Sequence, residues 1–171
     1  MNYNHSIKSI LNQLPKINQI ILSSVYTKEL QNYYFPTLFI RSKNISFPLI
    51  LGLSLCYPNK EIICFQDAND FMNSLDSCII LKEKNISNIV LFAFNDGLDL
   101  NLKKTALNLG FKYAYQINKI NSMEPVMNWI NEKNNGSRFI ELNVMKEELE
   151  EIPNNINPYE NCKKFMENLN F

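Results

Sequence analysis

Short apolar runs alternate with helix-like segments along most of this chain, and that alternation limits the folds it can adopt. One run, Ile89 to Phe94, is apolar at every position, so it needs cover on both faces of a sheet. Alternating strands and helices favour parallel strands joined by right-handed helical crossovers. We therefore predict an α/β fold with three layers: a doubly wound, mainly parallel sheet of about six strands, with helices on both faces.

Residue types and spacing place the expected elements. Runs rich in Ile, Val, Phe or Tyr predict strands at Gln19–Ser23, Thr37–Arg41, Glu61–Gln66, Asn88–Phe94, Phe111–Gln116 and Arg138–Asn143. The segments between them predict helices at Thr27–Tyr34, Ser46–Cys56, Asp70–Glu83, Leu100–Leu109 and Glu124–Lys133. Asp70 is expected to cap the third of these helices. The pattern stops after Asn143, so we expect residues 1–150 to form one domain and residues 151–171 a C-terminal tail with a short helix.

Composition restricts the partners of the chain. Lys+Arg and Asp+Glu both total 17, so no excess of positive charge supports nucleic-acid binding. The longest apolar run, Phe47 to Cys56, is too short to span a bilayer, and residues 1–6 lack the layout of a signal peptide. The four cysteines are widely spaced and predict reduced thiols. We expect a cytoplasmic protein with no nucleic-acid and no membrane partner.

The inventory of reactive residues excludes several kinds of site. His5 is the only histidine, and it lies in an N-terminal segment that we expect to be frayed, so a His-based triad or a His-rich metal site is excluded. The chain has four glycines, which cannot assemble a Walker A loop or a dinucleotide-binding fingerprint.

Two polar loops follow neighbouring strands of the expected sheet. The first spans Gln66 to Asp70, and the second spans Asn95 to Leu98. In a doubly wound sheet, ligands collect at the carboxyl ends of the strands, where loops and helix N-termini converge. These two loops therefore form the candidate site.

Four short segments occur in a fixed order: Thr27–Leu30, Leu51–Lys60, Ile62–Phe65 and Asn95–Gly97. With this order and spacing, the chain from about residue 19 to residue 144 resembles the diphosphate-binding (PP) domain of thiamine diphosphate (ThDP)-dependent decarboxylases. It is most similar to the phosphonopyruvate and sulfopyruvate decarboxylase type. The resemblance implies the ThDP-binding fold, an oligomer, and a cofactor site at the two polar loops.

The resemblance also implies roles for individual residues. In the family a Gly-Asp-Gly turn opens a helix and an Asn-Asn pair follows; the Asp and the second Asn bind Mg²⁺, whose preferred ligands are oxygens. A gapless alignment puts Ala68 at the metal-binding Asp. A one-residue slip instead makes Asp67 the ligand, opposite Asp96. The positions implied for cofactor binding are Asp67, Ala68, Asn69, Asn95, Gly97 and Lys43, and those implied for the metal are Asp67 and Asp96.

Lys43 stands where the family has an apolar side chain under the thiazolium ring of ThDP. A lysine there would set one cation against another in a site of low dielectric constant. The family places the carboxylate that activates ThDP in a separate pyrimidine (PYR) domain, so catalysis would need another chain.

Three hypotheses follow. The first is a degenerate, cofactor-free PP-type domain, a pseudoenzyme with a structural or protein-interaction role; it accounts for Lys43, Ala68 and the missing glycines together and is preferred. The second is a beta-type subunit of a 2-oxo acid decarboxylase that binds ThDP and Mg²⁺ with a PYR-type partner chain. The third is an unrelated doubly wound domain that binds another small ligand at the same strand ends.

Overall fold

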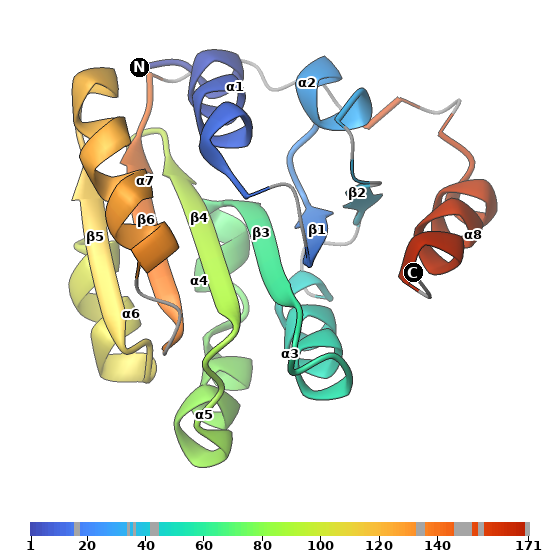
Figure 1. The fold of residues 1–171 in the computed structure, drawn as a ribbon. Helices are drawn as coiled ribbons and strands as arrows, with labels where there is room; N and C mark the ends of the chain where they lie inside the picture. Colours follow the sequence, from blue (N-terminus) through green and yellow to red (C-terminus); the bar gives the residue numbers. More distant parts are fainter. Residues whose placement is uncertain are drawn as a thin grey trace.

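Six parallel strands form the centre of the molecule (Figure 1). The computed structural model describes residues 1–15, 18–33, 35, 37–41, 45–132, 136–145, 152–153 and 156–169. The strands are β1 (Gln19–Ser23), β2 (Thr37–Phe39), β3 (Glu61–Asp67), β4 (Ile89–Asn95), β5 (Tyr113–Ile117) and β6 (Arg138–Asn143). Their order is β2-β1-β3-β4-β6-β5, and every neighbouring pair is parallel. The expected fold class and all six expected strands are confirmed.

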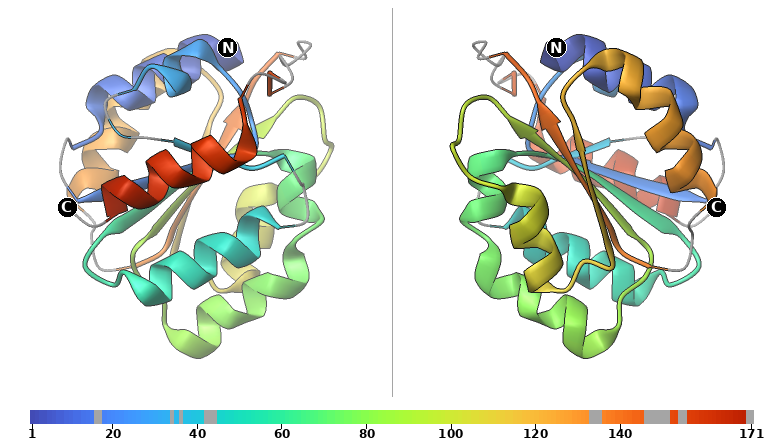
Figure 2. Two further views of the ribbon diagram at one scale, coloured as in Figure 1. Left: turned by 90° about the vertical axis from the view of Figure 1, so that its right-hand side faces the viewer. Right: turned by 90° about the vertical axis from the view of Figure 1, so that its left-hand side faces the viewer.

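Helices cover both faces of the sheet (Figure 2). They are α1 (Tyr3–Gln13), α2 (Lys28–Gln31), α3 (Ser46–Cys56), α4 (Ala68–Met72), α5 (Leu75–Lys84), α6 (Leu102–Leu109), α7 (Met123–Glu132) and α8 (Pro158–Leu169), with a 3-10 turn, η1 (Ile120–Ser122). One face packs against α1, α2 and α7. The other packs against α3, α4, α5, α6 and α8. None of the described helices is long and apolar enough to cross a membrane.

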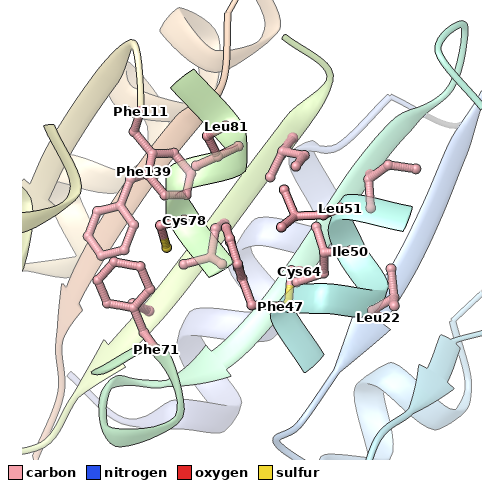
Figure 3. Close-up of a cluster of buried hydrophobic side chains, with 14 of the residues drawn as sticks. Leu22, Phe47, Ile50, Leu51, Cys64, Phe71, Cys78, Leu81, Phe111 and Phe139 are labelled. Atoms are coloured by element: carbon pink, nitrogen blue, oxygen red, sulfur yellow. The ribbon is translucent and has the colours of Figure 1, made fainter. Parts of the chain in front are cut away.

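An aromatic cluster lies in the core on the face of the sheet that α3, α4, α5, α6 and α8 cover (Figure 3). The ring of Phe139 on β6 lies 4.7 Å from that of Phe71 on α4 and 5.4 Å from that of Phe111, measured between centroids. All three side chains are buried. Tilted and edge-on aromatic pairs add stability beyond the area that they bury. This cluster fixes α4 against the sheet and so sets where the loop after β3 can lie.

The N-terminal segment is an ordered helix, so the expectation of a frayed segment is wrong. The side chain of Asn2 accepts a hydrogen bond from the backbone N–H of His5 (2.8 Å) and caps α1. Tyr3, Ile7 and Ile10 lie on its buried side. Their helical spacing gives α1 one apolar face, which packs on the sheet. His5 itself is exposed.

The helix expected from Asp70 to Glu83 is two helices, and its expected cap is also wrong. The Ser74 hydroxyl donates to the carbonyls of Asp70 (3.0 Å) and Phe71 (2.9 Å), which ends α4 by offering the backbone a local alternative. Asp67 caps α4, because β3 extends one residue further than expected and leaves Asp67 in an extended conformation. Asp70 lies inside the first turn.

The C-terminal helix α8 lies along the edge strand β2 (Figure 1). Phe165 and Leu169 are buried in the core beneath it. In the orientation that satisfies both ends of its amide, Asn161 donates to the carbonyl of Thr37 (3.1 Å) and accepts from the N–H of Phe39 (3.1 Å). The side chain thereby pairs with backbone groups that an edge strand otherwise leaves exposed.

Candidate functional site

At the carboxyl ends of the strands, two pairs of neighbouring strands send their chains to opposite faces of the sheet. After β1 the chain leaves towards α2, whereas after β3 it leaves towards α4 on the opposite face. After β4 it leaves towards α6, whereas after β6 it turns to the face covered by α1. Crevices form where neighbouring strands send their chains to opposite faces, and ligands commonly bind there. The two predicted loops follow β3 and β4, so each lies at one of these two places.

At the end of β3, the carboxylate of Asp67 is used within the fold. One oxygen accepts from the backbone N–H of Asn69 (2.8 Å), and the other accepts from the hydroxyl of Tyr3 on α1 (3.4 Å). Ala68 is fully buried in the core, while Asn69 is exposed. The carboxylate that the resemblance offers as a metal ligand therefore caps one helix and contacts another.

A second carboxylate stands at the same helix. Asp70 is 1% exposed and lies in the first turn of α4. Burial raises the pKa of the Cys64 thiol on β3, and the nearby negative charge of Asp70 raises it further. Carboxylates at a helix N-terminus neutralise its partial positive charge. The start of α4 therefore carries two negative groups of its own.

At the end of β4, Asn95 shapes the loop that follows. Its side-chain oxygen accepts from the N–H groups of Gly97 (3.2 Å) and Leu98 (2.8 Å). Its amide nitrogen donates to the carbonyl of Leu98 (3.2 Å) and to the carboxylate of Glu141 (2.9 Å). Gly97 has φ +134°, a conformation that side-chain-bearing residues rarely adopt. Within the fold, these two predicted residues set the shape of the turn.

Glu141 is a site residue that the sequence analysis did not identify. Its side chain is 1% exposed on β6, and its second oxygen accepts from the backbone N–H of Lys103 (3.1 Å) in the first turn of α6. The signal in the sequence is a charged residue between the apolar residues Ile140 and Leu142, since buried charges are rare without a partner. Glu141 thus satisfies one N–H group at the N-terminus of α6, beside the N-cap Asn101, whose side chain accepts from the N–H of Lys104 (2.8 Å).

These residues line a pocket of about 580 Å³ across the ends of β4, β5 and β6. Three carboxylates face it, those of Asp96, Asp99 and Glu141, and its lining contains no Lys or Arg. The remaining lining residues are Asn95, Gly97, Leu98, Leu100, Asn101, Gln116, Asn143 and Val144. An acidic lining of this kind favours neutral or cationic ligands over anions.

The structure separates the predicted cofactor residues into two groups. Asn95, Asp96 and Gly97 line the pocket, whereas Asp67, Ala68 and Asn69 do not. Asp67 pairs with Phe94 across the sheet, so Asp96 lies two residues beyond that pair. A shared Mg²⁺ between Asp67 and Asp96 stays a prediction. Among the described residues, no group of three or more His, Cys, Asp or Glu side chains is arranged to hold a metal ion. Lys43 lies outside the described residues.

Comparison with known proteins gives a relationship of fold. No protein-family model and no curated protein matches the chain. Among solved structures it is similar to benzoylformate decarboxylase from Polynucleobacter necessarius, with a TM-score of 0.65 and 14% identity. The likeness covers 89% of this chain but 34% of the decarboxylase chain. It shows the fold alone. The α/β fold with its parallel sheet and helices on both faces is the one that the sequence led us to expect.

Proposed function

We propose that this chain is a degenerate PP-type domain of the phosphonopyruvate and sulfopyruvate decarboxylase kind, with no catalysis of its own and a structural or protein-interaction role. The observation that carries the proposal is the use of Asp67. Its carboxylate caps α4 (2.8 Å to the N–H of Asn69) at the place where the resemblance puts the diphosphate and the metal. Under this proposal the protein acts in the cytoplasm, as a homo-oligomer or beside a PYR-type chain.

The charges at the carboxyl edge do not fit a diphosphate. A diphosphate binds where backbone N–H groups and a helix N-terminus are open to it. At α4 that position is taken by Asp67, and Asp70 adds a second negative charge. At α6 the N–H groups of Lys103 and Lys104 are taken by Glu141 and Asn101. The neighbouring pocket adds Asp96 and Asp99 without any cationic side chain, so a diphosphate there would meet charge repulsion.

One observation favours the alternative, a ThDP- and Mg²⁺-binding subunit of a 2-oxo acid decarboxylase. Asp96 is partly exposed in the pocket, and its carboxylate makes no hydrogen bond with any other described residue. A bound Mg²⁺ would reverse the local charge and allow a diphosphate to approach the acidic lining. This alternative needs a PYR-type partner chain to supply the activating carboxylate.

Calorimetric titration with ThDP and Mg²⁺, run on the purified chain alone and then with an added PYR-type chain, separates the two functions. We expect no saturable heat and no rise in melting temperature up to about 1 mM ThDP, because a ligand that does not bind the native state cannot stabilise it. Inorganic diphosphate with Mg²⁺ serves as a second probe for the edge itself.

Saturable micromolar binding by the wild type would overturn the proposal. If Asp67→Asn and Asp96→Asn each abolished that binding, while Asp99→Asn left it unchanged, the two predicted metal ligands would be assigned. Repeating the titration with an added PYR-type chain tests whether binding requires a partner.

A further inference from the structure

Helix α5 presents apolar side chains to solvent. Ile79 is 58% exposed and Ile80 is 37% exposed. The neighbouring helix α3 contacts α5 (Figure 2). Leu55 on α3 is 52% exposed. We call these three side chains and the outward surface around them the α3–α5 face. Exposed apolar side chains that gather on adjacent elements mark interaction surfaces more often than scattered ones do.

Two opposite charges flank this surface along α5. Asp76 lies four residues before Ile80, and Lys84 lies four residues after it. Eight residues of helix separate the two charges by about 12 Å, too far for an ion pair within one copy. The positions three and four residues away from each charge on α5 are apolar, and neither charge has an ion pair or hydrogen bond with another described residue.

A second copy of the same helix supplies the missing partners. When two α5 helices lie antiparallel and meet at Ile80, Asp76 of each copy faces Lys84 of the other. Glu83 then faces Ser77, so the pairing sets no two like charges directly opposite each other. An interface with two-fold symmetry uses the same patch on both copies, and complementary charges at its rim fix the register. The formal net charge of the chain is +0, so whole-molecule repulsion does not oppose association.

We propose that two copies of this chain form a dimer through the α3–α5 face, with antiparallel α5 helices crossing at Ile80. This face lies away from the carboxyl edge of the sheet. The inference therefore stands whether or not that edge binds a cofactor, and the test is run without one.

The test is the mass of the particle in solution, measured by sedimentation between about 1 and 200 µM protein. We expect the wild type to approach twice the 20.0 kDa mass of one chain as concentration rises. Ile80→Asp should raise the dimer dissociation constant about 100-fold, since it buries a charge at the centre. Asp76→Lys and Lys84→Asp should each raise it about 10-fold, because each replaces two attractions with two repulsions.

The double variant Asp76→Lys with Lys84→Asp should restore the dissociation constant to within about threefold of the wild type. The matched control is Glu124→Lys, which reverses an exposed charge in the first turn of α7 on the other face of the sheet. A monomeric wild type at 200 µM would overturn the proposal. So would a dimer unaffected by Ile80→Asp, failure of the double variant to restore association, or equal weakening by Glu124→Lys.

Discussion

The parallel strands all start on one side of the sheet, which we call the amino edge, and end on the opposite side, the carboxyl edge. The two edges hold buried charged side chains in different ways. At the amino edge, the guanidinium of Arg138 donates to the carboxylate of Glu61 (2.7 Å) and to the carbonyl of Ile130 (2.8 Å). At the carboxyl edge, Asp67 and Glu141 accept only from neutral donors, which include the first backbone N–H groups of α4 and α6. At the amino edge a cationic side chain pairs with the carboxylate, whereas at the carboxyl edge N–H groups of helix N-termini donate to the carboxylates.

The difference shows which helix N–H groups already have a partner within the chain. Helix N-termini have unsatisfied N–H groups and a partial positive charge, and they attract anions. In this chain the backbone N–H of Asn69 on α4 and that of Lys103 on α6 already donate to carboxylates of the chain itself, those of Asp67 and Glu141. The amino edge needs no such arrangement, because its carboxylate already has a cation. Substitutions at the two edges should therefore cost different amounts of stability, which the first three of the following four experiments test; the fourth probes the interior between the edges.

The largest effect should come from Arg138→Met at the amino edge. We expect the free energy of unfolding to fall by about 3 kcal/mol, because Glu61 loses its cation in a mostly buried site and the carbonyl of Ile130 loses its donor. Urea denaturation at pH 7 measures the change. The control, Lys104→Met on the exposed side of α6, should stay within about 0.5 kcal/mol. If Arg138→Met lowered the free energy of unfolding no more than Lys104→Met does, the proposed difference between the two edges would be wrong.

Glu141→Gln should have the next largest effect. The amide keeps the size of the side chain but turns one acceptor into a donor, which then faces either the N–H of Lys103 or the amide of Asn95. We expect a loss of about 2 kcal/mol in urea denaturation. The exposed residue Glu132, at the end of α7, provides the control Glu132→Gln. Equal stability of the two variants would show that the contacts of Glu141 contribute little.

Asp67→Ala should cost less, about 1 kcal/mol, which is typical of the loss of a helix cap. The reason is that α4 is short and its N–H groups can turn to water at the exposed Asn69. Thermal unfolding followed by circular dichroism measures the change, with Asp99→Ala in the exposed loop after β4 as the control. A loss above that of Glu141→Gln would reverse the order proposed for the two carboxylates.

The smallest effect is expected from chemical labelling of the cysteine thiols, which reports on the interior of the sheet between the two edges. Cys56 and Cys162 are exposed, whereas Cys64 and Cys78 are buried. Burial raises the pKa of Cys78 to about 12, and it raises the pKa of Cys64 well above the ordinary value of a thiol. The folded state therefore holds these protons more tightly, and thiolate is scarce at pH 8.

We expect two thiols per chain to react with a disulfide reagent at pH 8 and four to react after denaturation. Raising the pH to 9 should leave the count at two, since the pKa of Cys78 lies about three units higher. Reaction of all four native thiols at pH 8 would show that the sheet interior opens readily.

The fold could be predicted from the sequence because its signals are local. The run Ile89 to Phe94 is apolar throughout, and the segments on either side have helical spacing. The missed helix α1 also has a local signal in Asn2, Tyr3, Ile7 and Ile10, whose spacing is helical. The break at Ser74 depends on a single hydroxyl and has a weaker signal.

The candidate site could be predicted only in part, because its contacts are not local. The loop from Asn95 to Gly97 was identified from its residue types, and these residues line the pocket, but their role in binding stays a prediction. The contact between Asn95 and Glu141 joins residues 46 positions apart. It depends on strand order, with β6 placed beside β4. No spacing rule gives that order, so the sequence could not show that the carboxylate of Glu141 accepts from the first turn of α6.

The position of Asn161 has a consequence for how the chain is made. Strand β2 is synthesised long before Asn161, the residue that covers its outer edge, since Phe39 and Asn161 are 122 positions apart. Until translation reaches α8, the nascent sheet ends in bare peptide groups, which can pair with any neighbouring strand. Ribosomes that stall before residue 161 should therefore release chains that aggregate, even though their sheet is complete.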